Sequence, residues 1–387
     1  MDACLVGWQL WIECLLALAG GVYALGLGWF TRGIRAQPAV AGHRPFVSVV
    51  VAARNEAGRI PDLLQGLDCQ TYPADRWEVI VVDDRSTDHT AEVARAHWGG
   101  LPRMVVLCAE GAGKKAALAQ GLAAASGELI LTTDADCRVP PTWVEGMAAA
   151  CGPGVDMAVG FSQIAAPGQT RGWREGLEAL DFLHLMGAAL GSASQGGALA
   201  ASGQNLAFRA EVFARVGGYR RVQHRASGDD VLLLQLVRRQ GGKIAFATDT
   251  GTYVVHPPSP SWRALLAQRA RWASNAPYQL LLSPGFFAYI SLVFGCNLLL
   301  VASPVLWFLG GVRAGWVVAL WLGKGVAEAV LSWRASAFFG RRDLRCYFPA
   351  WWVVQPFYLV LAGMLGSLGI FDWKGRAHRW GRRRLRP

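Results

Sequence analysis

The fold is decided by one stretch of the chain, Glu128-Leu129-Ile130-Leu131-Thr132-Thr133-Asp134-Ala135-Asp136. Its first six residues are typical of a buried strand, and two carboxylates stand at the carboxyl end. Ligands of open α/β sheets bind at the carboxyl ends of strands. Carboxylates one residue apart suit a hard divalent cation that carries a diphosphate. The triplet alone indicates a metal site only weakly, so the rest of the chain must decide.

Strand and helix patterns alternate around this stretch. We expect strands over 46–53, 78–82, 103–108 and 129–133, and helices over 58–67, 87–98 and 113–125. This alternation predicts an α/β fold with a mainly parallel, doubly wound sheet. The pattern is looser after residue 156, where we expect helices over 173–190, 229–240 and 261–276, a strand over 243–247, and a mobile Gly/Ala/Ser-rich loop over 191–203.

The composition indicates membrane segments, because a chain of 387 residues has a mean hydropathy of +0.26 and only 17% charged residues. Residues 3–30 predict an N-terminal transmembrane helix that is too long for a signal peptide. Arg32 and Arg35 follow it, so the positive-inside rule places the soluble block, residues 46–280, in the cytoplasm. Glu13 marks either a polar path in the membrane or a position near its outer interface.

Further apolar stretches follow at 285–311, 314–333 and 346–371, each near the roughly 20 residues that a span needs. Lys324 and Glu328 stand four apart on one face and can pair. Three spans would place the basic tail, 372–387, outside, against the positive-inside rule. We therefore expect two transmembrane helices over 285–333 and a re-entrant or interfacial segment over 346–371, where Pro349 and Pro356 favour a break.

The net charge of +11 is concentrated in that tail, which holds seven basic residues and one acid. Nucleic-acid binding is the alternative explanation of such a tail. Its place after an apolar segment fits a membrane flank more simply, so we expect no nucleic-acid partner. The eight cysteines form no C-x-x-C pair, which indicates neither a disulfide framework nor a zinc site.

Acids also follow the other expected strands. Asp83 and Asp84 end the second strand, and Glu56 follows the first. Carboxylates in these places can accept hydrogen bonds from a nucleobase and from ribose hydroxyls. Helix capping is the structural alternative for residues 86–88, and we expect Asp88 to be structural.

Two lysines follow a short glycine-rich run, Gly111-Ala112-Gly113-Lys114-Lys115. The P-loop pattern fails, because Cys108 takes the place of its first Gly and Lys115 the place of its Ser or Thr. A lysine near a helix N-terminus can still meet a diphosphate. Solvated surface lysines are the alternative.

Ser227-Gly228-Asp229-Asp230 opens an expected helix, where the helix dipole favours acids. The functional alternative is a general base that deprotonates an acceptor hydroxyl, with His224 as a second candidate. Further along, Gln268 and Arg271 share a face of the expected amphipathic helix 261–276, next to Trp272. Such a pair can hold a pyrophosphate, and a helix lying on the membrane surface is the alternative.

Taken in order, these elements resemble membrane-bound family 2 glycosyltransferases over about residues 46–275. The elements are Val51-Ala52-Ala53-Arg54-Asn55-Glu56, Asp83-Asp84-x-Ser86-x-Asp88, Lys115-Ala116-Ala117-Leu118, Asp134-x-Asp136, Gly203-x-Asn205, Gly228-Asp229-Asp230 and Gln268-x-x-Arg271-Trp272. The last is typical of the branch that holds cellulose, hyaluronan and poly-N-acetylglucosamine synthases and ceramide glucosyltransferases.

The resemblance implies a Rossmann-like GT-A fold that uses a nucleotide sugar, usually a UDP-sugar, and Mg²⁺ or Mn²⁺. It also implies the roles of individual residues. Glu56, Asp83 and Asp84 would hold the nucleoside, and Ala53 would also contact the nucleotide sugar. Lys115 would approach the diphosphate, Gln268, Arg271 and Trp272 would hold the diphosphate and the acceptor mouth, and Asp136 with Asp134 would bind the metal and the donor. Gly203 and Asn205 would belong to the acceptor or sugar region. Asp230 would be the catalytic base, with Asp229 beside it.

The implied reaction is inverting, metal-dependent transfer from a UDP-hexose or UDP-N-acetylhexosamine to a hydroxyl of a membrane lipid. We expect an integral protein of the inner (plasma) membrane with a cytoplasmic catalytic domain. Asp229 stands where the family usually has Glu, and Arg85 where it often has Gly. The gating-loop motif of processive synthases is not evident, and the spans are few. We therefore rank two alternatives lower, a processive polysaccharide synthase and a non-catalytic nucleotide-sugar-binding membrane protein.

Overall fold

The structure, a computed structural model, describes residues 3–97, 103–222, 227–373 and 376–378. The chain divides into two compact units. The sheet unit comprises Gly33–Thr170 and Leu185–Pro258, and the membrane-helix unit comprises Met1–Arg32, Arg171–His184 and Ser259–Pro387. The sheet unit is smaller than the expected domain of residues 46–280, because the expected helix 261–276 belongs to the membrane-helix unit.

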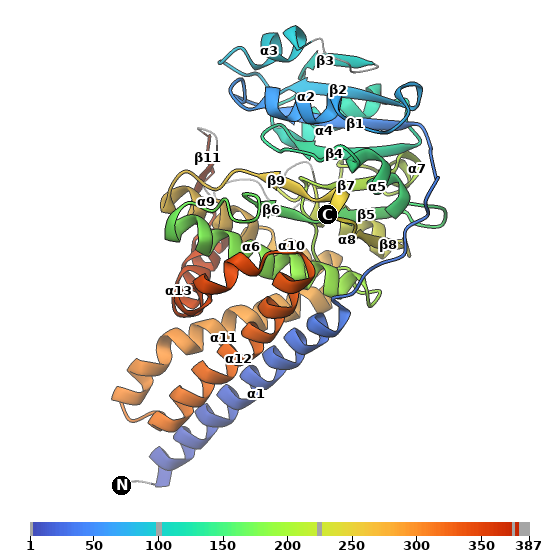
Figure 1. Cartoon of the computed structure of the whole chain (residues 1–387). Coiled ribbons are helices and arrows are strands. Elements are labelled where there is room, and N and C mark those ends of the chain that lie inside the picture. The colour runs from blue at the N-terminus through green and yellow to red at the C-terminus, as the bar shows by residue number, and fades with distance from the viewer. Residues whose placement is uncertain (1–2, 98–102, 223–226, 374–375, 379–387) are drawn as a thin grey trace. The chain divides into compact units, whose positions relative to one another are not determined.

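A seven-stranded sheet forms the centre of the sheet unit (Figure 1). Its order is β3 (Met104–Cys108), β2 (Trp77–Asp83), β1 (Val47–Ala53), β4 (Leu129–Asp134), β7 (Leu206–Arg209), β5 (Met157–Gly160) and β8 (Ile244–Ala247). The first four strands are parallel, and β7 is antiparallel to both β4 and β5. The predicted α/β fold with a mainly parallel sheet is therefore confirmed. A second, small sheet pairs β6 (Ser162–Ile164) with β9 (Val254–His256).

Helices cover both faces of the central sheet, which explains why its strands are continuous apolar runs rather than alternating ones. They are α2 (Ile60–Asp68), α3 (Thr90–Ala96), α4 (Lys114–Ala124), α5 (Trp143–Ala150), α7 (Ala210–Arg215) and α8 (Val231–Arg239), with short 3₁₀ turns at Ala74–Arg76 and Thr250–Thr252. Helix α4 lies so close to the sheet that a Cβ on Gly121 would stand 2.5 Å from Val50 Cγ1. This close approach fixes where α4 begins.

The membrane-helix unit contains α1 (Ala3–Gly33), the first part of α6 (Gly172–Ala193), α9 (Trp262–Ala273), α10 (Ala276–Leu282), α11 (Pro284–Phe308), α12 (Ala314–Phe338) and α13 (Phe348–Ser367). A 3₁₀ segment, Arg342–Tyr347, precedes α13, and strands β10 (Phe371–Trp373) and β11 (Arg376–His378) follow it. Among the described residues, four helices are long and apolar enough to cross a membrane, namely Gly7–Gly33, Pro284–Phe308, Ala314–Phe338 and Arg342–Ser367. Most of the basic tail lies outside the described residues.

A buried polar cluster links the apolar helices. Lys324 Nζ donates to both carboxylate oxygens of Glu328, at 2.6 and 2.7 Å, which confirms the predicted pair. Tyr23 Oη on α1 donates to Glu328 Oε1 at 2.6 Å, and Gln355 Oε1 on α13 accepts from Lys324 at 3.0 Å. Charged groups among apolar helices are costly unless they are paired, so this cluster fixes how α1, α12 and α13 meet.

Glu13 forms an ion pair with Arg313. It is 2% exposed and accepts from Arg313, whose Nε and Nη2 atoms lie 2.9 and 2.5 Å from its two oxygens. Arg313 stands in the connection between α11 and α12, and its side chain is 63% exposed. Large exposed aromatic residues, Trp8, Trp11, Trp307 and Phe308, occur near these positions in the chain, as is typical of a membrane interface.

Helix α13 packs most extensively against α9, then against α11, and only sparsely against α12. The break expected at its prolines is wrong, because Phe348–Ser367 is one helix with Pro349 in the first turn and Pro356 inside it. Pro349 lacks an N–H, but the N–H groups of a first helical turn have no partner within the helix, so its loss costs nothing. Pro356 removes a hydrogen bond inside the helix, and tertiary packing outweighs that cost. The interfacial or re-entrant position of 346–371 stays a prediction.

We predict that Glu328→Gln destabilises the protein, because it leaves the Lys324 ammonium buried and without its counter-ion. Removing one partner of a buried pair costs about 3–5 kcal/mol. The double variant Lys324→Met/Glu328→Leu should recover most of that loss. Thermal unfolding of the detergent-solubilised protein checks this, and a Glu328→Gln variant as stable as the wild type would contradict it.

Candidate functional site

The carboxyl ends of three neighbouring strands carry the predicted acids. Ala53 of β1 pairs with Asp83 of β2, and Ala52 of β1 pairs with Asp134 of β4. The register therefore places Asp83 and Asp134 on either side of β1 at one edge of the sheet. In open α/β sheets this edge is where ligands bind.

Asp83 has a carboxylate oxygen that the protein does not satisfy. Its Oδ2 accepts from the Ser86 N–H at 3.1 Å. Its Oδ1 is buried and finds no hydrogen-bond partner among the residues that the structure describes. Buried polar atoms are normally hydrogen-bonded, so this oxygen is suited to accept from an N–H or O–H group of a ligand. The nucleoside is the ligand that the sequence predicts here.

Asp84, by contrast, is used inside the protein. Its Oδ1 accepts from the Gly113 N–H at 2.9 Å, and its Oδ2 lies 3.7 Å from Arg54 Nη1. Asp84 is 4% exposed and holds the residue that precedes α4. Ala53 is buried, as is Glu56, whose Oε2 lies 3.5 Å from Arg59 Nη1. The nucleoside contacts expected of these three residues stay predictions.

The loops after β1 and β2 are joined by hydrogen bonds. The Asn55 N–H donates to Ser86 Oγ, and the Thr87 N–H donates to Asn55 Oδ1, both at 2.9 Å. Asp88 accepts from the Ala57 N–H at 3.0 Å and from Thr90. This is the structural role expected for Asp88, and it holds the two loops together beside Asp83.

Arg85 stands where the resemblance leads us to expect glycine. Its φ of 58° is left-handed, a conformation that costs a residue with a side chain about 1 kcal/mol. The guanidinium donates to the Glu110 carbonyl oxygen at 2.7 Å, which offsets part of that cost.

Lys114, rather than Lys115, meets the acids. Its Nζ lies 2.7 Å from Asp134 Oδ1 and 2.7 Å from Asp229 Oδ2. Lys115 Nζ donates instead to the main-chain oxygens of Val222 and Ser227, at 3.0 and 2.6 Å. The sequence placed both lysines in the first turn of one helix, but the motif comparison selected Lys115 and missed its neighbour. The diphosphate role expected of Lys115 stays a prediction that this geometry does not favour.

The charges in this group stabilise one another. Loss of hydration would lower the pKa of Lys114, but Asp134 and Asp229 outweigh that effect and hold the pKa well above its usual value. Burial would likewise raise the pKa of Asp229, but its pairing with Lys114, together with the charge of nearby Lys115, outweighs that effect and holds the pKa below its usual range. Lys114 therefore stays a cation and Asp229 an anion at neutral pH.

Asp230 is the N-cap of α8, and it is held in place by two main-chain donors. The Val231 N–H donates to its Oδ1 at 2.6 Å, and the Gly203 N–H donates to its Oδ2 at 3.0 Å. Burial, and then the charge of Asp229, raise the pKa of Asp230 above that of an ordinary Asp. A carboxylate with a raised pKa is a better proton acceptor, as a general base requires.

Gly203 leaves no room for a side chain. A Cβ on it would stand 3.0 Å from Asp229 Oδ2, 3.2 Å from Lys114 Nζ and 3.6 Å from Asp230 Cβ. The glycine thus lets the main chain approach all three charged groups. This contact joins Asp230 to the ionic group of Lys114, and through it to Asp134 on β4.

Asn205 faces the interior of the protein. It is 0% exposed, its Oδ1 accepts from Trp143 Nε1 at 2.9 Å, and its Nδ2 donates to the oxygens of Phe161 and Thr252 at 2.9 and 2.7 Å. The amide therefore ties Asn205 to α5, to the residue between β5 and β6, and to the 3₁₀ turn Thr250–Thr252. Its expected place in the acceptor region stays a prediction, which these contacts do not favour.

The acids fit a divalent cation that arrives with a diphosphate. Within the described part of the chain, no three His, Cys, Asp or Glu side chains gather as a metal site. Asp134 keeps 29% of its side chain exposed, and Asp136 is partly exposed two residues later. Mg²⁺ is usually held by one or two carboxylates together with phosphate and water oxygens, so these two acids suffice. His224 lies outside the described residues.

Gln268, Arg271 and Trp272 lie on α9, in the membrane-helix unit. Gln268 Oε1 accepts from Arg269 Nη1 at 3.1 Å, and the guanidinium carbon of Arg269 lies 4.3 Å from the centroid of the Trp272 ring. The predicted site residues thus divide between the two units. Their joint role in binding a diphosphate stays a prediction.

Comparison with known proteins finds a family match over part of the chain. Residues 48–217 match the family described as "Glycosyl transferase family 2". The chain is 36% identical to glycosyltransferase AglE of Haloferax volcanii over 125 residues, and this aligned region covers 32% of this chain and 41% of that protein. It is 36% identical over 138 residues to beta-monoglucosyldiacylglycerol synthase of Nostoc sp., covering 35% of this chain and 29% of that one.

A third relative is undecaprenyl-phosphate 4-deoxy-4-formamido-L-arabinose transferase of Pseudomonas aeruginosa, 31% identical over 131 residues, or 33% of this chain and 38% of that protein. The match thus spans less than half of each relative. Among solved structures, the mannosyltransferase PcManGT of Pyrobaculum calidifontis, in complex with GDP-Man and Mn²⁺, superimposes with a TM-score of 0.60 at 22% identity, covering 93% of this chain and 98% of that one. This likeness shows the fold, which is GT-A.

We predict that Gly203→Ala weakens the binding of a nucleoside diphosphate, because the added methyl group displaces Lys114 and Asp229. The affinity for UDP or GDP with Mn²⁺, measured by calorimetry, should fall about tenfold, which equals about 1.4 kcal/mol. Gly58→Ala is the matched control, since its Cβ would meet nothing within 4 Å. Equal affinities of the two variants and the wild type would contradict this description of the site.

Proposed function

We propose, from the premise that residues 48–217 form a family 2 glycosyltransferase domain, that the protein transfers a sugar from a nucleotide sugar to a hydroxyl group of a membrane lipid. One observation carries the proposal. The Gly203 N–H holds Asp230, a carboxylate with a raised pKa, next to the ionic group that Lys114 forms with Asp134 and Asp229. A base therefore stands beside a charged centre suited to a diphosphate.

The donor we propose is a UDP-hexose or a UDP-N-acetylhexosamine. Support comes from the unsatisfied Asp83 Oδ1, which can accept from a nucleobase or ribose donor, and from the resemblance of the motifs to enzymes that use UDP-sugars. Gln268, Arg271 and Trp272 would contribute to binding of the diphosphate. We assign the diphosphate contact expected of Lys115 to Lys114 instead, because the Lys115 ammonium is held by two carbonyl oxygens.

Asp230 would remove the proton from the acceptor hydroxyl. The acceptor oxygen then attacks the anomeric carbon, the bond from that carbon to the diphosphate oxygen breaks, and the nucleoside diphosphate leaves with the electron pair. A single displacement of this kind inverts the anomeric configuration. Asp229 is paired with Lys114 and remains an anion. Of the two neighbouring acids, Asp230 is therefore the one that would act as the base.

The leaving diphosphate gains negative charge, which cationic groups must stabilise. Lys114 is the cation of the sheet unit that supports this role most directly, and Arg271 would assist. A bound Mg²⁺ or Mn²⁺ would neutralise phosphate charge as a Lewis acid, with Asp134 and Asp136 as its ligands. Lys114 already balances Asp134, so the cation and the nucleotide would bind together rather than the cation first.

A lipid acceptor is supported by the membrane-spanning candidates and by relatives whose names specify diacylglycerol and undecaprenyl-phosphate products or substrates. We propose an integral protein of the inner membrane, with the sheet unit in the cytoplasm, where nucleotide sugars are available. The processive synthase is the second candidate. A long polymer formed by the purified protein would favour it over single transfer.

We predict that Asp230→Asn abolishes sugar transfer, by at least about 100-fold, because general-base catalysis contributes roughly 10²–10⁴-fold. Affinity for UDP or GDP with Mn²⁺ should persist, since the base does not hold the nucleotide. Asp75→Asn, at an exposed position of the same unit, serves as the control. An Asp230→Asn variant with full activity would overturn the assignment.

The pH dependence of transfer tests the same assignment. The base must be unprotonated, and its pKa is raised, so kcat/KM should fall as the pH is lowered through a pKa above that of an ordinary Asp. Metal and donor are kept saturating across the range. A rate that stays constant down to the pKa of an ordinary Asp would contradict the role of Asp230.

A further inference from the structure

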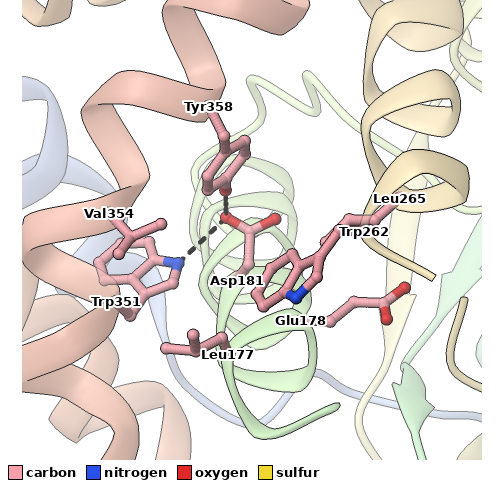
Figure 2. Close-up of a pocket in the computed structure, with 8 residues that line it drawn as sticks. All are labelled: Leu177, Glu178, Asp181, Trp262, Leu265, Trp351, Val354 and Tyr358. Carbon is pink, nitrogen blue, oxygen red and sulfur yellow. Dashed lines mark hydrogen bonds between the residues drawn. The ribbon is translucent and has the colours of Figure 1, made fainter. Parts of the chain in front are cut away.

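Asp181, on α6, is a buried acid on which donors from two other helices converge. Arg269 Nη2 on α9 donates to its Oδ2 at 2.7 Å. Trp351 Nε1 on α13 donates to its Oδ1 at 3.2 Å, and Tyr358 Oη donates to the same oxygen. Figure 2 shows Asp181 between Trp351 and Tyr358. One carboxylate thus joins three helices of the membrane-helix unit.

Arg269 extends this group to the residues expected to bind the donor. The arginine is 7% exposed, and the Asp181 side chain is 11% exposed, so the pair is largely removed from water. The other end of the guanidinium, Nη1, donates to Gln268 Oε1 at 3.1 Å, and the guanidinium carbon lies 4.3 Å from the Trp272 ring centroid. A single guanidinium therefore contacts Asp181, Gln268 and Trp272 at once.

Helices α6, α9 and α13 leave a small space next to Asp181, although α9 and α13 pack extensively against each other. A small pocket remains between the three helices, lined by Leu177, Glu178, Asp181, Trp262, Leu265, Trp351, Val354 and Tyr358 (Figure 2). Glu178, one turn before Asp181, is occupied by Ser259, whose N–H and hydroxyl donate to it. Asp181 accepts from Arg269 and thus holds one end of its guanidinium.

We propose that Asp181 and Arg269 are positioning residues, which orient Gln268 and Trp272 for the sugar donor, and that α13 supports this orientation through Trp351 and Tyr358. This inference rests on the proposed function, since it takes Gln268 and Trp272 to contact the donor. The fork of the guanidinium is essential, because a lysine offers one ammonium and cannot bridge an acid and an amide while stacking on a ring.

The test compares Arg269→Lys with Arg263→Lys in the full-length, detergent-solubilised protein. Both changes keep the charge on α9, and Arg263 is exposed. We expect KM for the donor, and the dissociation constant for UDP with Mn²⁺, to rise about tenfold in Arg269→Lys, with kcat within about threefold of the wild type and the thermal unfolding midpoint unchanged. Arg263→Lys should match the wild type throughout.

A second variant reaches the same residues from α13. Tyr358→Phe removes one donor to Asp181 without touching α9, and it should raise the donor KM by about threefold. Wild-type donor KM values in both Arg269→Lys and Tyr358→Phe would overturn the proposal. A loss of affinity that simply follows a lowered unfolding midpoint would also overturn it, because that pattern indicates a structural role alone.

Arg271→Ala separates failure of this inference from failure of the proposed function. If Arg271→Ala binds UDP with Mn²⁺ as the wild type does, α9 does not bind the donor, and both the donor role of α9 and the inference fail. If Arg271→Ala loses affinity while Arg269→Lys and Tyr358→Phe do not, the proposed function stands and the positioning role is wrong.

Discussion

The ionic contact of Lys114 with Asp134 and Asp229 is the interaction on which the site depends. It joins Asp134, at the end of the parallel strand β4, to Asp229, which directly precedes the N-cap of α8. The antiparallel strand β7 lies between these two residues in the chain. Two acids in such proximity would repel each other without the ammonium between them. Gly203 then brings the main chain close enough to hold Asp230 at this centre.

Much of the sheet unit could be predicted because its strands are long apolar runs with acids at their ends. The short strands β5 and β7, four residues each, lack a pattern of useful length, and β7 runs antiparallel because of tertiary pairing alone. Lys114 and Lys115 are neighbours in one helical turn, so which of them meets the acids depends on the chain around Val222 and Ser227. No local pattern contains that information.

In the membrane-helix unit, too, contacts set by local spacing could be predicted from the sequence, whereas contacts between distant residues could not. The Lys324–Glu328 pair follows from a spacing of four within one helix, so the sequence predicts it. The contacts of Asp181 join residues 88 and 177 positions apart, and they were not foreseen. Family resemblance identified α9 by its Gln, Arg and Trp but gave no role to Arg269, which links those side chains to α6 and α13. The helix for which we propose a role in donor binding is thereby anchored by residues distant in sequence.

The claim that the protein moves a sugar to a lipid is tested most directly by identifying its product. The purified full-length protein is incubated with Mn²⁺, membrane lipid extract and, in turn, UDP-, GDP- and dTDP-sugars, and the lipids are analysed by mass spectrometry and NMR. The account predicts a lipid that gains one sugar, formed from a UDP-sugar with inverted anomeric configuration. A retained configuration, or no sugar-bearing product with any donor, would contradict it.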